Sequence, residues 1–266
     1  MMVNMQWIFD QAATWLTTME GALVISACIF GWAVLAALRF SRRMKPVTIG
    51  LQQAIAEIRE IPNETEFANS YEQFIEGISG NLILVHAWEE FEDVLLPDAG
   101  SNPPLVYNTR NPAEFFSRES IVTPRVDLRF YNAVPNLLTG MGILGTFMGL
   151  VAGIWLAGAG LSANDTEVAI KALQSLLGGA ALAFLTSIAG LLSSLLFTFY
   201  EKRQVHFVGR LISTWVDELD KRLRRVTSEG LARDQLEQSR QQTVTLKQFS
   251  SELAWQIADE VGKRFN

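Results

Sequence analysis

Residues 131–160 read YNAVPNLLTGMGILGTFMGLVAGIWLAGAG, and this stretch decides the fold of the chain. It carries no charged residue, and a helix that crosses a bilayer needs about 20 apolar residues. The stretch is also rich in glycine, with Gly145, Gly149 and Gly153 recurring at every fourth position. Small residues at this spacing form one ridge on which a second helix can pack closely. The sequence therefore predicts a transmembrane helix with a close helical neighbour.

Two further uncharged runs are long enough to cross a membrane. Residues 21–38 form a run of 18 residues, and residues 172–200 form a run of 29. Hydropathy therefore predicts three transmembrane helices, with residues 131–160 as the second. The predicted fold class is an all-α membrane protein whose three transmembrane helices have long cytoplasmic helical extensions.

Basic residues beside the spans predict the orientation, because Lys and Arg concentrate on the cytoplasmic side of a membrane. Residues 1–20 carry none, whereas the seven residues after the first span carry four and the 25 residues after the third span carry seven. Residues 1–20 and the loop 161–171 are therefore expected in the periplasm. Residues 39–130 and 201–266 are expected in the cytoplasm.

Composition excludes several classes of function. The net charge is −6, and residues 57–119 hold thirteen acidic and three basic residues, which argues against direct binding of nucleic acid. One cysteine and two histidines leave no zinc-type spacing. No phosphate-binding loop or nucleophile motif occurs, so neither an enzyme nor a covalent cofactor is expected.

The two cytoplasmic regions are predicted to be helical. In residues 39–130, apolar residues recur at helical spacing up to Pro97, and 98–104 read as a loop. These helices are expected to pack against the cytoplasmic extensions of the spans. Residues 201–266 continue as an amphipathic helix, with Gly230 as the expected interruption.

The tail predicts association between subunits, because nothing else in the chain is available to cover its apolar stripe. The pattern runs to the end of the sequence, which predicts a tail that continues in a longer protein. The residues expected to associate are Leu246, Phe249, Leu253 and Ile257.

The third span carries small and hydroxyl residues at helical spacing. Those expected to share one face are Gly179, Ala183, Ser187, Gly190 and Ser194. Thr146 on the second span and Thr186, beside Ser187, add hydroxyls near the middle of the membrane. Two interpretations remain open: the hydroxyls bond backbone carbonyls and only permit close packing, or they line an ion pathway.

No Asp, Glu, Lys, Arg or His lies within any of the three runs. A relay for protons or sodium ions normally needs a carboxylate at membrane depth. An ion channel built from this chain would therefore need a partner helix that supplies the carboxylate.

The segments LLTGMGILGTFMGLVAGI and ALAFLTSIAGLLSS resemble the two pore helices of the MotA/TolQ/ExbB proton-channel family. Thr146 matches the hydroxyl of the first pore helix. Ser187, three residues before Gly190, matches that of the second, where the family more often has threonine. Three spans with an outer N-terminus resemble TolQ/ExbB rather than the four-span MotA. The resemblance covers about residues 113–200.

Within this family, NPAEFFS (residues 111–117), the 131–147 segment and the extended tail most resemble the ZorA group, the motor subunits of Zorya anti-phage defence. The resemblance implies an inner-membrane ring of five subunits around two copies of a single-span partner. That partner carries a membrane Asp and a domain that binds peptidoglycan. Flow of H⁺ or Na⁺ would rotate the ring among the membrane lipids, and the tail would signal to cytoplasmic effectors. A TolQ/ExbB-type role at the outer membrane and a passive scaffold remain alternatives.

The acidic stretch HAWEEFED, residues 86–93, is a further candidate site. On a helix, Glu89, Glu92 and Asp93 would share a face, and a hard cation such as Ca²⁺ binds several carboxylate oxygens. A solvated acidic face is the alternative.

Overall fold

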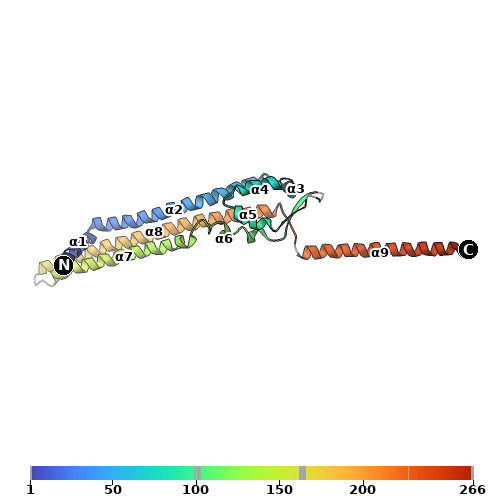
Figure 1. Ribbon diagram of the computed structural model, residues 1–266. Helices are drawn as coiled ribbons and strands as arrows, with labels where there is room; N and C mark the ends of the chain where they lie inside the picture. Colours follow the sequence, from blue (N-terminus) through green and yellow to red (C-terminus); the bar gives the residue numbers. More distant parts are fainter. Residues whose placement is uncertain (1, 99, 101–102, 162–165, 227, 265–266) are drawn as a thin grey trace.

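The computed structural model describes residues 2–98, 100, 103–161, 166–226 and 228–264. Three long helices run side by side in a bundle, short helices and a small sheet cover one end of it, and a separate tail helix extends from that end (Figure 1). The helices are α1 (Met2–Leu16), α2 (Met19–Arg59), α3 (Glu64–Asn69), α4 (Tyr71–Ser79), α5 (Val85–Glu92), the 3-10 helix η1 (Pro112–Glu114), α6 (Arg118–Ile121), α7 (Leu128–Leu161), α8 (Thr166–Asp220) and α9 (Ser228–Arg264).

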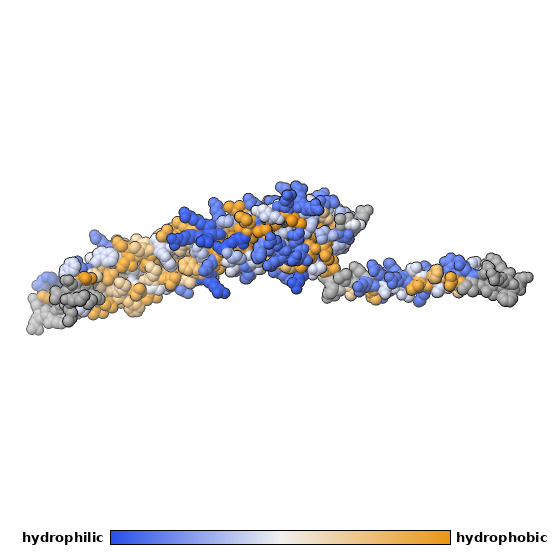
Figure 2. Space-filling view, in the orientation of Figure 1, coloured by the Kyte–Doolittle hydropathy of each residue, from blue (hydrophilic) through white to orange (hydrophobic). Residues whose placement is uncertain are grey.

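Helices α2, α7 and α8 are each long and apolar enough to cross a membrane. Helix α2 has 41 residues and α8 has 55, which correspond to about 60 and 80 Å at 1.5 Å per residue. A hydrocarbon core is only about 30 Å thick, so both helices continue well beyond it. Figure 2 shows the apolar surface over the half of the bundle nearer α1 and a hydrophilic surface at the other end.

The helices begin where side chains cap them. Thr18 accepts a hydrogen bond from the Gly21 amide at the start of α2, and Asp127 accepts one from the Phe130 amide at the start of α7. Such bonds satisfy amides that have no partner within the helix. The loop predicted for residues 161–171 is shorter in the structure, because α8 already begins at Thr166. Residues 162–165 lie outside the described part.

The region predicted as mostly helical also contains a three-stranded sheet. Strand β1 (Leu95–Asp98) pairs antiparallel with β2 (Leu105–Asn108), and β3 (Arg224–Arg225) lies parallel to β2. The predicted helix therefore stops at Glu92 instead of reaching residue 96. Pro97 cannot donate a helical hydrogen bond, and the turn residues that follow favour a hairpin.

The short helices pack on the far end of α8, as the sequence predicted. Trp215 of α8 stacks on Phe74 of α4 at 6.4 Å between ring centroids and meets Phe116 edge-on at 5.7 Å. Trp88 of α5 packs against the same two phenylalanines. This aromatic cluster fixes the end of the bundle that carries the sheet, called here the sheet end.

The described residues 221–226 form the break between the bundle and the tail, which was predicted at Gly230; Gly230 is instead inside α9. Helix α8 ends at Asp220 because the chain is diverted into the sheet, where the Val226 amide donates to the Asn108 carbonyl at 2.9 Å. Leu223, which falls within the helix predicted for residues 201–266, is buried within this break. Helix α9 then leads away from the bundle (Figure 1).

Candidate functional site

The contact between α7 and α8, called here the seam, is a direct approach of two backbones. A Cβ atom added at Gly190 would lie 2.7 Å from both the Cα of Gly142 and the carbonyl oxygen of Leu138. A Cβ at Gly149 would lie 2.6 Å from that of Ala183. Glycine is therefore required where the helices cross, as in other closely packed membrane helices.

The structure places all five predicted packing glycines in this seam. Gly145 faces Thr186, and Gly153 and Gly179 lie near one another with 3.7 Å between the Gly153 Cα and a Cβ built on Gly179. Gly142 was missed by the sequence analysis. Its position three residues before Gly145 continues the buried stripe and could have identified it.

Two hydroxyls hold the seam together. Thr146 donates to the Ala183 carbonyl across the seam at 3.0 Å, in addition to a bond within its own helix to Gly142 at 3.2 Å. Thr186 is buried and donates to the Ala183 carbonyl at 2.7 Å, with the Gly142 carbonyl at 3.4 Å. Within one chain the hydroxyl of Thr186 therefore serves packing, and its place on an ion pathway stays a prediction.

Ser187 is different from its neighbour. It is half-buried, and its hydroxyl makes no hydrogen bond within the described part of the chain. Between Gly179 and Phe197 the buried stripe of α8 uses Thr186 and Ser193 instead of the predicted Ser187 and Ser194. Its members are Gly179, Ala183, Thr186, Gly190, Ser193 and Phe197, and Glu201 continues it four residues later. Residues at alternating spacings of four and three stay on the face that contacts the partner helix in a left-handed supercoil. Residues at repeated spacings of four lie progressively further from that face.

Ser187 and Ser194 directly follow buried residues of α8, and so does Thr146 on α7. In antiparallel helices, residues that directly follow the contact residues turn toward the same side of the contact. Residues seven apart then share that side. We call this side of the seam the polar strip. It consists of Asn132, Thr139 and Thr146 on α7 and of Ser187 and Ser194 on α8. Glu201, seven residues after Ser194, lies at the end of the strip and also belongs to the buried stripe of α8.

Helix α2 packs on α8 on the side of the seam away from the polar strip. An apolar cavity of about 190 Å³ lies between them, lined on α8 by Leu196, Phe197 and Tyr200 and on α2 by Phe30 and Ala33, among others. The polar strip is consequently the side of the seam that α2 leaves uncovered. The hydroxyls of Thr139, Ser187 and Ser194 are thus available to a neighbouring helix from another chain, whereas the hydroxyl of Thr146 already donates to the Ala183 carbonyl.

The predicted cation site stays a prediction, because one chain does not group its ligands. Among the described residues, no three His, Cys, Asp or Glu side chains are grouped so that they could hold a metal ion. Glu89 instead lies 3.7 Å from His86. Glu92, together with burial as the larger cause, raises the pKa of Tyr71 to about 12. Asp93 is the C-cap residue of α5 and keeps a right-handed helical backbone conformation.

The predicted tail residues lie on α9. Leu246, Phe249 and Leu253 are exposed, and the side chain of Ile257 lies outside the described part. Figure 2 shows apolar surface on the middle of this helix. The stripe is therefore uncovered within one chain.

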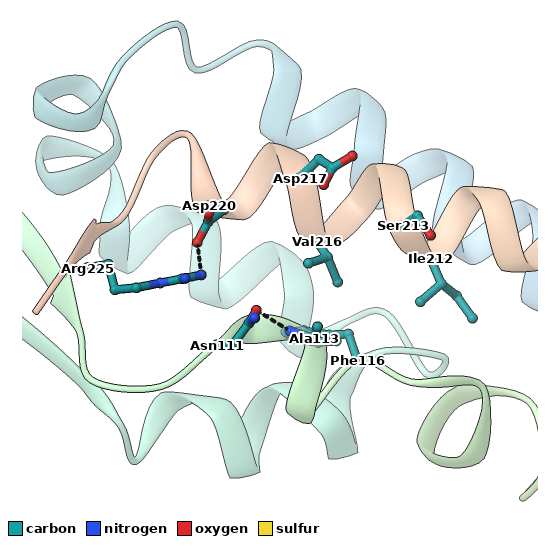
Figure 3. Close-up of a pocket in the computed structure, with 9 residues that line it drawn as sticks. All are labelled: Asn111, Ala113, Phe116, Ile212, Ser213, Val216, Asp217, Asp220 and Arg225. Atoms are coloured by element: carbon teal, nitrogen blue, oxygen red, sulfur yellow. Dashed lines mark hydrogen bonds and ion pairs between the residues drawn. The ribbon is translucent and has the colours of Figure 1, made fainter. Parts of the chain in front are cut away.

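A pocket of about 450 Å³ lies where the bundle joins the tail, at the end of α8 (Figure 3). Phe116 and Ile212 line its apolar part, while Asp220 and Arg225 form an ion pair of 2.6 Å at its rim. The pocket is remote from the seam, and it marks the joint as a separate region.

A charge cluster joins the same region to α2, with Glu218 and Arg222 buried and Arg59 exposed. Glu218 bonds Arg222 at 2.7 Å and Arg59 of α2 at 3.2 Å, while Arg222 also donates to the Ile61 carbonyl at 2.6 Å. The hydrogen bond from Arg222 is the main cause that lowers the pKa of Glu218, although burial opposes it. The ends of α2 and α8 are thus fixed to each other next to the tail.

This cluster predicts a pH-dependent stability. A carboxyl whose pKa is lowered by folding stabilises the folded state above its usual pKa of 4.5, and that stabilisation is lost as the pH falls through the lowered value. Glu218→Gln should therefore lower the thermal unfolding temperature in detergent at pH 7, with a difference that shrinks as the pH falls below 4.5. Asp217→Asn, an exposed neighbour, is the control. Equal unfolding temperatures of the wild type and Glu218→Gln at pH 7 would contradict the role of the cluster.

Comparison with known proteins gives two matches. The family model described as anti-phage protein ZorA of the Zorya type I system matches residues 10–259. The chain is also 30% identical over 189 residues to the Zorya protein ZorA of Escherichia coli O139:H28 (strain E24377A / ETEC), a region that is 69% of this chain and 25% of that protein. The chain is thus similar to about a quarter of that longer relative.

Proposed function

This chain belongs to the ZorA-like family of anti-phage proteins of the Zorya type I system, and from that premise we propose that it forms the ion channel of a rotary motor driven by protons or sodium ions. The motor would lie in the bacterial inner membrane, with the N-terminus in the periplasm and the C-terminus in the cytoplasm. Basic residues after the first and third spans support this orientation.

The polar strip is the observation that carries the proposal. Half-buried hydroxyls of Thr146, Thr139, Ser187 and Ser194 follow one side of the seam, on the face that α2 leaves open. Such hydroxyls are unfavourable on a lipid-facing surface, because hydroxyls in hydrocarbon lose their hydrogen bonds with water. A second helix on this face would enclose a polar passage between chains.

The composition of the spans supports an obligate partner. Residues 132–164 and 172–200 contain no titratable side chain of Asp, Glu, Lys, Arg or His. A single-span partner with one membrane Asp would supply the missing carboxylate. The proposed assembly is a pentamer of this chain around two such partners, each held to peptidoglycan by a periplasmic domain.

The tail provides a route for the output of the motor. Copies of α9 from the five subunits would cover the exposed residues Leu246, Phe249 and Leu253 in a shared bundle. The cluster of Arg59, Glu218 and Arg222 fixes the bundle end from which the tail leaves. Rotation of the ring would then reach cytoplasmic effector proteins through the tail.

Ion flux in proteoliposomes tests the proposal. The chain reconstituted alone should conduct neither protons nor sodium ions, and co-reconstitution with the single-span partner should produce flux. A partner with its membrane Asp changed to Asn is the matched control and should give none.

Flux through the chain alone would show that the partner carboxylate is not needed. Absence of flux from the assembled complex would favour a passive scaffold. Either outcome would overturn the proposed motor.

A further inference from the structure

Glu201 is a buried carboxylate directly after the uncharged run of α8. The residue is 2% exposed, although it is only one position beyond Tyr200. Within the described part of the chain, the ammonium of Lys202, 3.2 Å from Oε2, is the one cation in ion-pair range. Burying a carboxylate with a single cationic partner costs free energy of folding. The burial of Glu201 therefore points to a role beyond stability.

Glu201 lies at the end of the polar strip. It follows Ser194 by seven residues, and Ser194 follows Ser187 by seven. From Ser187 to Glu201 the helix rises about 21 Å at 1.5 Å per residue. The strip thus leads from the middle of the span toward the sheet end and finishes at a carboxylate.

Lys202 connects α8 to α7 at this end of the strip. Its ammonium donates to the side-chain oxygen of Asn132 on α7 at 2.9 Å while it neighbours Glu201. Asn132 is the last member of the strip on α7 and Glu201 lies at its end on α8, so one lysine spans both. The arginines at the same level on α2 (Arg39, Arg42 and Arg43) and Arg129 on α7 are exposed, and none of them is paired with Glu201.

We propose that Glu201 receives the transported monovalent cation at the sheet end of the polar strip and that Lys202 displaces the cation from it. For a proton, Oε2 takes the proton from a hydronium ion in the strip, which leaves water and breaks the ion pair. When Lys202 returns, the carboxyl gives the proton to a water molecule on the far side, which leaves as hydronium. For a sodium ion, the carboxylate binds and releases the ion by the same exchange. This inference rests on the proposed channel function.

Flux through the complete complex tests the inference. Glu201→Gln should lower the flux about tenfold or more, the factor that corresponds to about 1.4 kcal/mol in barrier height, while the complex assembles normally. Glu201→Asp keeps a carboxylate and should recover part of the flux. Asp217→Asn, which removes an exposed acid further along α8, should leave the flux unchanged.

The pH profile separates transport from a structural role. In Lys202→Gln, protonated Glu201 is no longer opposed by a positive charge, so the pH of half-maximal proton flux should move upward. A purely structural lysine would change the amount of assembled complex without moving this profile. Parallel measurements with a proton gradient and with a sodium gradient identify the cation.

The outcomes are distinct. Wild-type flux in Glu201→Gln, or an unmoved profile in Lys202→Gln, overturns the inference and leaves the channel intact. Absence of flux in the wild-type complex overturns the channel itself. If the complex with Glu201→Gln does not assemble, the Glu201→Asp variant provides the test. A pH profile of flux that differs from the wild-type profile supports the inference, and an unchanged profile contradicts it.

Discussion

Replacing Gly190 with alanine is expected to force α7 and α8 apart and to destabilise the whole bundle. The added Cβ would lie 2.7 Å from the Gly142 Cα and 2.7 Å from the Leu138 carbonyl oxygen. Both atoms belong to the backbone, so neither can move aside without shifting a helix. Overpacking of this kind costs about 1–3 kcal/mol, occasionally more. The measurement is the thermal unfolding temperature of the purified chain in detergent.

The chain offers matched controls for this substitution. Gly178 on α8 and Gly140 on α7 have no atom within 4 Å of an added Cβ. Gly178→Ala and Gly140→Ala should be neutral or slightly stabilising, because alanine is the better helix former. Similar unfolding temperatures for Gly190→Ala and Gly178→Ala would mean that the seam is not closely packed.

Ser187→Ala is expected to abolish phage protection while leaving the protein stable. The hydroxyl of Ser187 makes no hydrogen bond within the described part of the chain, so its removal costs little folding free energy. Its loss removes a polar group from the proposed ion pathway. Plaque assays should show protection at the level of cells without the system, with normal amounts of the protein in the membrane.

The adjacent Thr186 should behave in the opposite way. Thr186→Ala removes the hydroxyl that donates to the Ala183 carbonyl at 2.7 Å, a membrane hydrogen bond worth about 0.6–2 kcal/mol. Lower thermal stability is therefore expected, and Thr186→Ser should restore it. Full protection by Ser187→Ala would return this residue to a packing role and would remove the main support for the pathway.

The three spans could be predicted because hydropathy is a local property. The same holds for Gly145, Gly149 and Gly190, whose spacing indicates close packing without any knowledge of the partner helix. The choice between Thr186 and Ser187 could not be made in this way. The two residues are 100° apart on a helix, and only the supercoil of α8 on α7 decides which one is buried.

The end of α8 shows a second limit of the sequence. Leu219 and Leu223 continue an apolar stripe, and no glycine or proline interrupts it. The helix ends because Arg222 donates to the Ile61 carbonyl and the chain then joins β2. Both partners are more than one hundred positions away along the chain, so the local sequence pattern cannot predict these contacts.

Glu201 was overlooked for a related reason. It directly follows the third uncharged run, where a charged residue normally marks the exit of a helix into water. Its burial depends on the packing of α7 against α8 and on Lys202, which bonds Asn132. A step of seven from Ser187 through Ser194 to Glu201 was visible in the sequence and could have indicated it.

Water accessibility along α8 tests the central claim that the polar strip lines an ion pathway. Single cysteines are introduced by Ser187→Cys and Ser194→Cys, and by Ile188→Cys and Leu195→Cys at the adjacent positions, in a chain that carries Cys28→Ser. Ile188 and Leu195 are 60% and 68% exposed in one chain, yet they should face lipid or a neighbouring subunit. In membranes that contain the assembled complex, a water-soluble thiol reagent is predicted to label positions 187 and 194 and to stop ion flux, and to leave 188 and 195 unlabelled. Labelling at 188 and 195 but not at 187 and 194 would contradict the account.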